Sequence, residues 1–190
     1  MAKQTEIKKN KAENKMREAR LVKMVLSVAG TGEKLERGER LLKMLSGMNP
    51  QKLKSKKRIP SLGVRPGLET GCKVTIRKNI PVLLKRLLAA IDNEIKEKQI
   101  ENNHFSFGIH EYIEIPGTEY QRDIGILGLN VTLDFERKGK RVERKKIKQG
   151  HIPRKQQVTQ EEIIEYMTRN FQTKIEKKKS KEEEEDDMPK

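Results

Sequence analysis

Two parts of the chain concentrate side chains that bind phosphate. Five of the seven residues in 52–58 are basic and none is acidic. The segment 72–77 then alternates apolar with polar residues, so that Lys73, Thr75 and Arg77 share one face of an expected strand. Lysine and arginine displace counterions from a nucleic-acid backbone, and a hydroxyl group adds a directional hydrogen bond to a phosphate. The pattern therefore predicts a sheet surface that binds a polynucleotide backbone.

The second basic part is 137–156, which holds ten lysines or arginines against a single acid, Glu143. Gly139 is flanked by lysines, as is typical of a hairpin turn, so we expect a basic β-ribbon here. A ribbon that merely carries solvated charge is the alternative, but the density of cations favours contact with RNA. The residues expected to bind RNA in the two parts are Lys52, Lys54, Lys56, Lys57, Arg58, Lys73, Thr75, Arg77, Arg137, Lys138, Lys140, Arg141, Arg144, Lys145, Lys146 and Lys148.

Catalytic and metal chemistry find little support in the sequence. Three histidines and one cysteine, Cys72, do not have the spacing of zinc ligands, and no nucleophile elbow or HExxH motif occurs. The alternative is an enzyme that acts on RNA with Mg²⁺ through Glu111, Glu114 or Asp123. Carboxylates that do acid–base work need a cleft and shifted pKa values, and the sequence indicates neither. We therefore expect a protein that is not an enzyme and that binds no metal or cofactor.

The charge of the whole chain points the same way. The 190 residues carry a formal net charge of +15, with 37% charged and 33% hydrophobic residues. Residues 176–190 hold five lysines against seven acids, a net charge of −2, so residues 1–175 carry +17. The positive electrostatic field of this net charge favours a polyanionic partner such as a nucleic acid. Binding to a membrane surface would require an amphipathic stretch with a basic and an aromatic face, and no such stretch occurs. The single cysteine excludes an internal disulfide and suits a reducing, intracellular compartment.

Apolar residues cluster between Leu21 and Phe171, which sets the expected domain organisation. Residues 1–18 are polar and lysine-rich, and we expect a basic disordered arm. The charge blocks of 176–190 predict a disordered tail. Between these ends, 19–175 has enough periodic apolar residues for a single RNA-binding domain.

Apolar periodicity predicts the elements of that domain. Alternation indicates strands at 20–28, within 105–115 and within 124–135, with Gly108 as a possible bulge. Phe105 and Phe107 fall on one strand face, where core packing is favoured over base stacking. Leucine and isoleucine spacing predicts three helices, of which the longest should cross the back of the sheet and leave its basic face free. These helices are expected at 34–46, 79–99 and 159–170, the last behind a capping box.

Five segments, in this order, resemble the universal L five family of large-subunit ribosomal proteins, in its archaeal and eukaryotic-like branch. They are MREARLVKMVLSVAGTGE (16–33), LGVRPGLETGCKVTIR (62–77), FSFGIHEYIEIPGTEY (105–120), IGILGLNVTL (124–133) and HIPRKQQVTQEE (151–162). The resemblance implies an α+β fold, an antiparallel sheet with helices packed on one face. It also implies a structural role in the cytoplasmic ribosome; a free RNA chaperone or assembly factor is the alternative.

The resemblance further implies the partners. They are 5S rRNA and the large-subunit rRNA in the central protuberance, neighbouring proteins there, and a small-subunit head protein across an inter-subunit bridge. Thr75 would belong to the 5S-binding surface. The glycine-rich loop 59–71 would approach P-site tRNA, with Arg65 at its tip. The loop residues expected to contact tRNA are Ser61, Leu62, Gly63, Val64, Arg65, Pro66 and Gly67.

The chain departs from the family pattern at two places. Met48 stands where a glutamine usually follows the glycine that ends the first helix, so a polar contact is lost there or is supplied by Asn49 or Gln51. The turn after the first strand reads VAGTGE rather than a sequence close to IGVGE, which leaves its geometry open.

Overall fold

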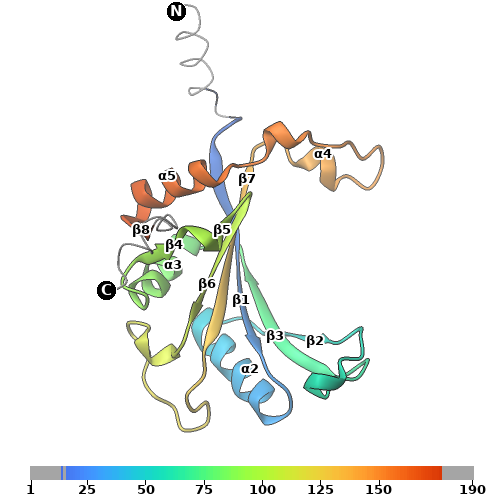
Figure 1. The fold of residues 1–190 in the computed structure, drawn as a ribbon, viewed down its shortest axis with the longest axis vertical. Coiled ribbons are helices and arrows are strands. Elements are labelled where there is room, and N and C mark those ends of the chain that lie inside the picture. Colours follow the sequence, from blue (N-terminus) through green and yellow to red (C-terminus); the bar gives the residue numbers. More distant parts are fainter. Residues whose placement is uncertain (1–13, 15, 177–190) are drawn as a thin grey trace, which may run out of the picture.

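One mostly antiparallel sheet forms the frame of the molecule (Figure 1). The computed structural model describes residue 14 and residues 16–176. The expected N-terminal arm and charged tail therefore lie almost wholly outside the described residues. The order of strands is β2-β3-β1-β7-β6-β5, and all pairings in this sheet are antiparallel. Its strands are β1 Ala19–Ala29, β2 Gln51–Lys54, β3 Glu69–Ile76, β5 Ile100–Glu101, β6 His104–Ile109 and β7 Leu129–Arg137. The α+β fold is confirmed.

Alternating side chains divide the sheet into a core face and an open face, as expected. Met24, Leu26 and Val28 of β1 are buried, and every second residue of β3, β6 and β7 joins them. Phe105 and Phe107 belong to this core, with ring centroids 5.8 Å apart, so the expectation of core packing is confirmed. The pairing of β6 with β7 runs without a register shift, so Gly108 is not a bulge.

Helix α2 (Glu33–Ser46) covers the core face over β1 and β3. Its buried leucines lie on one stripe, and Gly47 ends it in the left-handed region with φ 66°, as the sequence predicts. At Gly38 the helix comes so close to the sheet that an added Cβ would lie 2.8 Å from a methyl carbon of Val28. The thiol of Cys72 also lies in this contact, and burial raises its pKa.

We expect Gly38→Val to destabilise the protein by about 1–3 kcal/mol, because overpacking pushes α2 away from β1. Thermal unfolding with a spectroscopic readout measures the effect. The control is Arg40→Val, an exposed position of the same helix, where valine costs only its lower helix propensity, about 0.5 kcal/mol. Equal effects at the two positions would contradict the close contact.

The expected helix 79–99 is wrong in its extent. Helix α3 spans Ile80–Ala89, and Asp92 and Asn93 follow with φ of 53° and 59°. Two successive left-handed residues cannot continue a right-handed helix, and Asp and Asn tolerate that conformation. Ile95 then lies in β4 (Glu94–Lys96), which pairs in parallel with β8 (Lys174–Glu176). The leucines of α3 are buried in the core, but it is α2 that packs against β1 and β3.

The remaining helices bound the other end of the sheet. Helix α5 (Gln160–Phe171) begins behind a capping box of Thr159 and Glu162, as expected. The basic β-ribbon is wrong: no strand occurs in the described stretch 138–156, which instead forms a turn, the single-turn helix α4 (Arg141–Arg144) and a loop. Short 3₁₀ turns complete the fold, at η1 Pro60–Leu62, η2 Glu97–Gln99, η3 Tyr112–Glu114 and η4 Arg154–Gln156.

Candidate nucleic-acid interface

The open face of the sheet carries polar groups in rows that cross several strands. One row joins Gln51, Lys73, Ser27, Asn130 and Gly108 across five strands, each residue paired with the next. Successive side chains of a strand point to opposite faces, so these residues lie on the side away from the buried core. A face of this kind offers an ammonium, an amide and a hydroxyl group to a ligand that lies across the strands.

A second row runs beside the first, through Thr75, Val25, Thr132 and Ser106. Thr75 and Thr132 are half-buried and Ser106 is exposed, so their hydroxyl groups border solvent. Hydroxyl groups can both donate to phosphate oxygens and accept from ribose hydroxyls. The two rows together define the open face as a hydrogen-bonding surface.

Of the three residues predicted to share one strand face, Lys73 and Thr75 do so in β3, whereas Arg77 follows the end of that strand at Ile76. Lys73 and Thr75 are half-buried and Arg77 is exposed, whereas Val74 and Ile76 point into the core. Neither Lys73 nor Thr75 lies under α2, which packs on the opposite face of β3. The sequence pattern therefore placed these cationic and hydroxyl groups correctly relative to the sheet.

Lys52 lies on the other side of the sheet edge. It pairs with Cys72, whose side chain is buried in the core, and its Nζ lies 3.3 Å from Glu39 of α2 and 3.8 Å from Glu69. The hydrogen bond and the charge of Glu39 raise the pKa of Lys52. Lys52 is exposed but paired with Glu39, and the cations of this segment without an acid partner among the described residues are Lys54, Lys56, Lys57 and Arg58.

The loop after β2 is folded back on itself. Ser55 exchanges backbone hydrogen bonds with Gly67 and Leu68, and Ile59 forms a bridge with Val64. The bridge buries Val64 and leaves 60–63 as the closed end of the loop, where Leu62 is 72% exposed. Arg65 is exposed but lies outside the bridge, so Leu62 rather than Arg65 occupies the tip.

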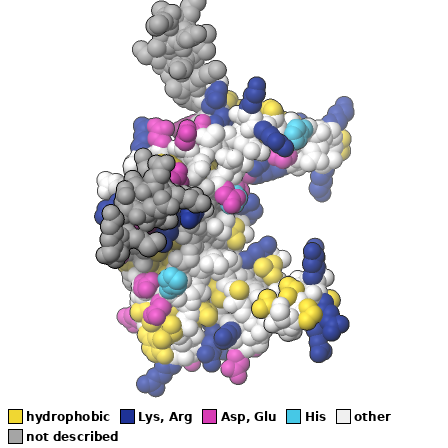
Figure 2. All heavy atoms as spheres, viewed as in Figure 1, with side chains coloured by type: hydrophobic (Ala, Val, Ile, Leu, Met, Phe, Trp, Pro, Cys, Tyr) yellow, Lys and Arg dark blue, Asp and Glu magenta, His cyan; other side chains and the backbone are white. Residues whose placement is uncertain are grey.

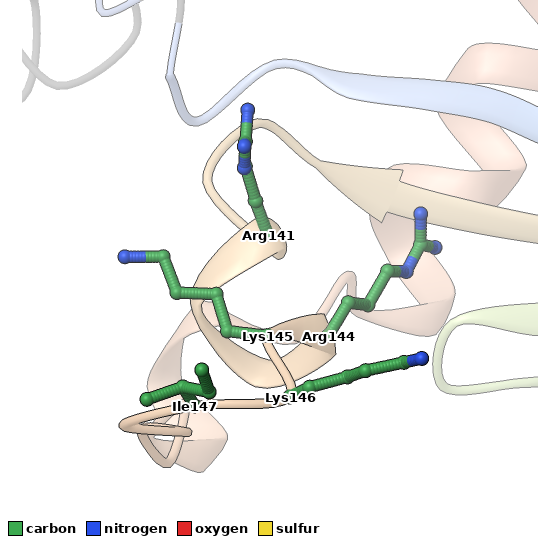
Figure 3. Close-up of a pocket in the computed structure, with 5 residues that line it drawn as sticks. All are labelled: Arg141, Arg144, Lys145, Lys146 and Ile147. Carbon is green, nitrogen blue, oxygen red and sulfur yellow. The ribbon is translucent and has the colours of Figure 1, made fainter.

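Cations gather around α4 at the other end of the open face. Arg141, Arg144, Lys145 and Lys146 line a shallow hollow of about 390 Å³ together with Ile147 (Figure 3). The four cationic side chains radiate from the helix and the loop after it instead of converging on one point. Such spreading suits an extended anionic surface with several phosphates better than a single small anion.

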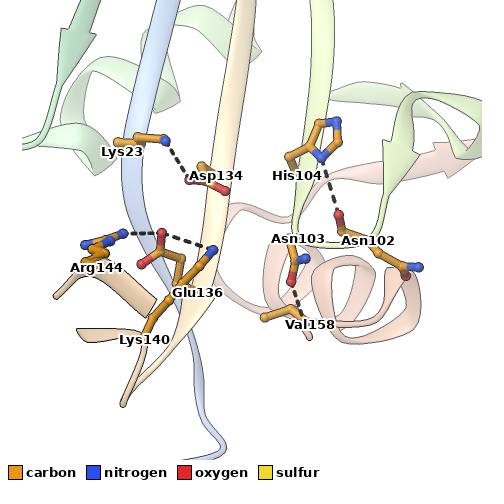
Figure 4. A network of polar contacts seen from close by, with 9 residues as sticks. All are labelled: Lys23, Asn102, Asn103, His104, Asp134, Glu136, Lys140, Arg144 and Val158. Carbon is orange, nitrogen blue, oxygen red and sulfur yellow. Dashed lines mark hydrogen bonds and ion pairs between the residues drawn. The ribbon is translucent and has the colours of Figure 1, made fainter. Parts of the chain in front are cut away.

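Buried Glu136 fixes α4 in place. Its carboxylate is 3% exposed, lies 3.4 Å from Nζ of Lys140, and accepts a hydrogen bond from Arg144 (Figure 4). Glu136 follows Asn130, Thr132 and Asp134 on the open face of β7, so these bonds seat α4 at the end of that face. The carboxylate of Glu136 therefore neutralises part of the positive charge of Lys140 and Arg144.

Arg137 points the opposite way and does not belong to the candidate surface. Its side chain is 7% exposed, and its guanidinium donates to both carboxylate oxygens of Glu162, at 2.5 and 2.6 Å. The sequence placed it in an exposed ribbon, but the strand β7 continues through it and turns it toward α5. The neighbouring Lys138 is exposed.

The exposed cations of 54–58 and of 138–148 lie on two projections with a recess between them (Figure 2). One projection is the loop after β2, and the other is the α4 segment, residues 138–150 (Figure 1). Lys and Arg side chains stud both, while the open face between them is mainly polar. Asp134 lies beyond the two rows on the same face of β7, and Nζ of Lys23 at 2.9 Å neutralises its carboxylate.

Several residues of the open face had no signal in the sequence as binding groups. Ser27, Ser106, Asn130 and Thr132 read only as the polar half of an alternating strand. Their places in the two rows depend on the register of β1, β6 and β7, which the periodicity of a single strand does not give.

The described residues hold no cluster of three or more potential metal ligands, and none of their helices is long and apolar enough to cross a membrane.

Comparison with known proteins shows the family of the chain. The C-terminal model of the ribosomal L5 protein family matches residues 69–174. The large ribosomal subunit protein uL5 of Nanoarchaeum equitans is 41% identical over 158 residues, which cover 81% of this chain and 94% of the relative. The uL5 protein of Sulfolobus acidocaldarius is 38% identical over 169 residues, covering 87% and 95%. That of Methanosphaera stadtmanae is 37% identical over 153 residues, covering 80% and 91%.

These relatives are structural proteins of the ribosome, which agrees with the expectation of a protein that is not an enzyme. The region matched by the family model includes β3, β6 and β7 of the open face and the α4 segment. The chain belongs to the uL5 family of large ribosomal subunit proteins.

Proposed function

We propose that this protein binds 5S rRNA and the large-subunit rRNA in the central protuberance of the cytoplasmic ribosome, through the open face, the α4 segment and the cations of 54–58 at the base of the loop after β2. The observation that carries the proposal is the pair of polar rows across the sheet, flanked at both ends by exposed cations. RNA-binding surfaces combine cations that position the phosphates with hydroxyl and amide groups that meet sugars and bases. Residues 19–175 form the proposed rRNA-binding domain.

The loop 59–71 is our proposed contact with P-site tRNA. Its closed end projects away from the sheet and carries exposed Leu62, with Arg65 and Arg58 on its flanks. A stiff loop with backbone hydrogen bonds across its base can reach a second RNA while the sheet holds the first. This division separates rRNA binding from tRNA contact.

Protein neighbours have a different surface available. Exposed apolar side chains gather on the segment between β6 and β7, which Figure 1 draws at the lower left. Ile113, Tyr120 and Ile126 are 38%, 56% and 69% exposed. Apolar groups of this kind favour protein contacts over phosphate contacts. We assign this segment to the contacts with a small-subunit head protein and with neighbours in the central protuberance.

The first test separates the two RNA contacts. We expect the double substitution Lys73→Ala and Thr75→Ala to weaken binding of 5S rRNA by about 10-fold to 100-fold, because it removes one phosphate contact and one hydroxyl contact from the open face. Arg65→Ala should leave 5S affinity unchanged and weaken only tRNA placement. Filter binding across a salt series measures the first effect, and tRNA footprinting on assembled ribosomes measures the second.

Two outcomes would count against the proposal. A loss of 5S binding in Arg65→Ala would show that the loop, and not the open face, holds this RNA. A protein that never sediments with large subunits from its own cell lysate would contradict the structural role. An assembly factor would exchange on and off these particles, whereas a constituent stays bound through repeated washes.

A further inference from the structure

Gly108 is unlike every other glycine of the chain. Each of the others either adopts a positive φ or lies so close to neighbouring atoms that a Cβ would come within about 3.0 Å of them. A Cβ on Gly108 would meet a single atom, Oδ1 of Asn130, at 3.2 Å, and that atom ends an exposed, flexible side chain. The backbone conformation and the packing of the fold therefore do not require a glycine here.

The strand itself gives no reason for the glycine either. Gly108 lies inside β6, and its pairing with Asn130 continues the register on both sides without a bulge. Glycine weakens a strand, because it leaves more backbone freedom to lose and brings no side chain to pack. The remaining physical reason for a glycine within a regular, exposed strand is the close approach of another molecule.

The surroundings of Gly108 identify the kind of molecule. Asn130 on its row and Ser106 on its own strand are exposed, and Thr132 pairs with Ser106. An amide and two hydroxyl groups around a bare stretch of backbone suit a nucleotide, whose flat base and ribose hydroxyl need a close surface with polar partners. Lys73 stands on the same row, and the Asp134 carboxylate is neutralised by Lys23 at 2.9 Å.

We propose that a nucleotide of ribosomal RNA lies directly against the bare backbone at Gly108, on the part of the open face formed by β7 and β6. Asn130, Thr132 and Ser106 then supply hydrogen bonds to its sugar or base edge. The inference rests on the proposed function, because it places one nucleotide at a defined position of the proposed rRNA surface. It adds a contact that depends on the absence of a side chain.

The test uses substitutions that favour the fold but block the approach. Gly108→Val places a β-branched residue in a strand, so the melting temperature should stay level or rise. Its affinity for 5S rRNA or for isolated large-subunit rRNA should fall at least about tenfold, with a smaller loss for Gly108→Ala, as a side chain of growing size holds the nucleotide away. Asn130→Ala should also lower affinity without changing stability.

The control is Thr168→Val, which places the same apolar side chain on an exposed position of α5 and should leave affinity unchanged. Lys73→Ala with Thr75→Ala, assayed in parallel, reports on the proposed function itself. If that double variant loses affinity while Gly108→Val keeps it for both RNAs, the inference fails and the proposed function stands. If wild-type protein binds neither RNA, both fail.

Two further outcomes would overturn the inference. A lowered melting temperature in both Gly108→Val and Gly108→Ala would show that the fold requires the glycine. Full affinity for free RNA combined with lost incorporation into large subunits would assign the position to a protein neighbour. Chemical probing of the bound RNA, with protection near one nucleotide that disappears in Gly108→Val, would support the proposed contact.

Discussion

Removal of three cations from the α4 segment should lower affinity for ribosomal RNA by about a hundredfold at physiological salt. The triple variant Arg141→Ala, Lys145→Ala and Lys146→Ala takes away exposed cations that line the hollow beside α4. Each cation that meets a phosphate releases counterions, so the slope of log affinity against log salt should also fall, by about 0.7–0.9 per residue. Binding assays over a salt series measure both quantities.

A charge-matched control decides whether the position of these cations matters. Lys34, Arg40 and Lys43 are exposed cations of α2, on the side of the sheet away from the open face. Their replacement by alanine changes the net charge by the same amount and should alter affinity only slightly. Equal losses in the two triple variants would mean that the protein binds RNA through its overall field and not through a defined surface.

The faces of the strands could be predicted because alternation is a local property. The residues of β3 and β7 that read as apolar in alternation are those in the core, as are Met24, Leu26 and Val28 of β1. The register shift between Leu21 and Lys23 interrupts the alternation in β1 and leaves Val22 half-buried. Lys73 and Thr75 lie opposite the core residues of β3. A strand buried on one face constrains every second side chain, so the pattern survives whatever the strand pairs with. The polar rows across five strands needed the pairing register as well, and only the structure supplies it.

The α4 segment shows what local patterns miss. Lysines around Gly139 looked like a hairpin, but buried Glu136 draws Lys140 and Arg144 together and favours a single helical turn. The acid was visible in the sequence, yet its burial depends on which residues close over it. The end of α3 is a similar case. Asp92 and Asn93 can lie within a helix or end it, and the pairing of Ile95 with β8 determines that the helix ends before them.

The sequence shows where basic residues are concentrated, but not which of them form ion pairs within the protein. Lys52 and Arg137 both lie in basic runs, but each is held by an acid of an adjacent helix, Glu39 in the first case and Glu162 in the second. From the sequence, every cation of a basic run is expected to bind RNA. Successive side chains of a strand point to opposite faces, however, so one cation of the run can face an acid of the protein while its neighbour faces solvent. Arg137 is buried as well, so its substitution is expected to change stability and not RNA binding.

The largest effect on stability should come from Glu162→Ala. The guanidinium of Arg137 is 7% exposed and donates to both oxygens of Glu162, and its Nε has no partner among the described residues. Removal of the carboxylate leaves a buried charge without compensation, which costs about 3–5 kcal/mol. It also removes the group that accepts the backbone N–H of Thr159 in the capping box. Denaturant unfolding measures the loss.

Glu161→Ala is the matched control, because Glu161 is an exposed acid in the same turn of α5. Its removal should cost less than about 1 kcal/mol, the value of an acid near a helix N-terminus. Replacement of both partners, as Arg137→Met with Glu162→Leu, should recover much of the stability lost in Glu162→Ala, since no unpaired charge remains. The same double variant should keep wild-type affinity for rRNA, because Arg137 lies under α5 and away from the open face. A large loss of affinity for rRNA in that stable double variant would show that Arg137 contacts RNA, and would contradict the conclusion that it only stabilises the fold.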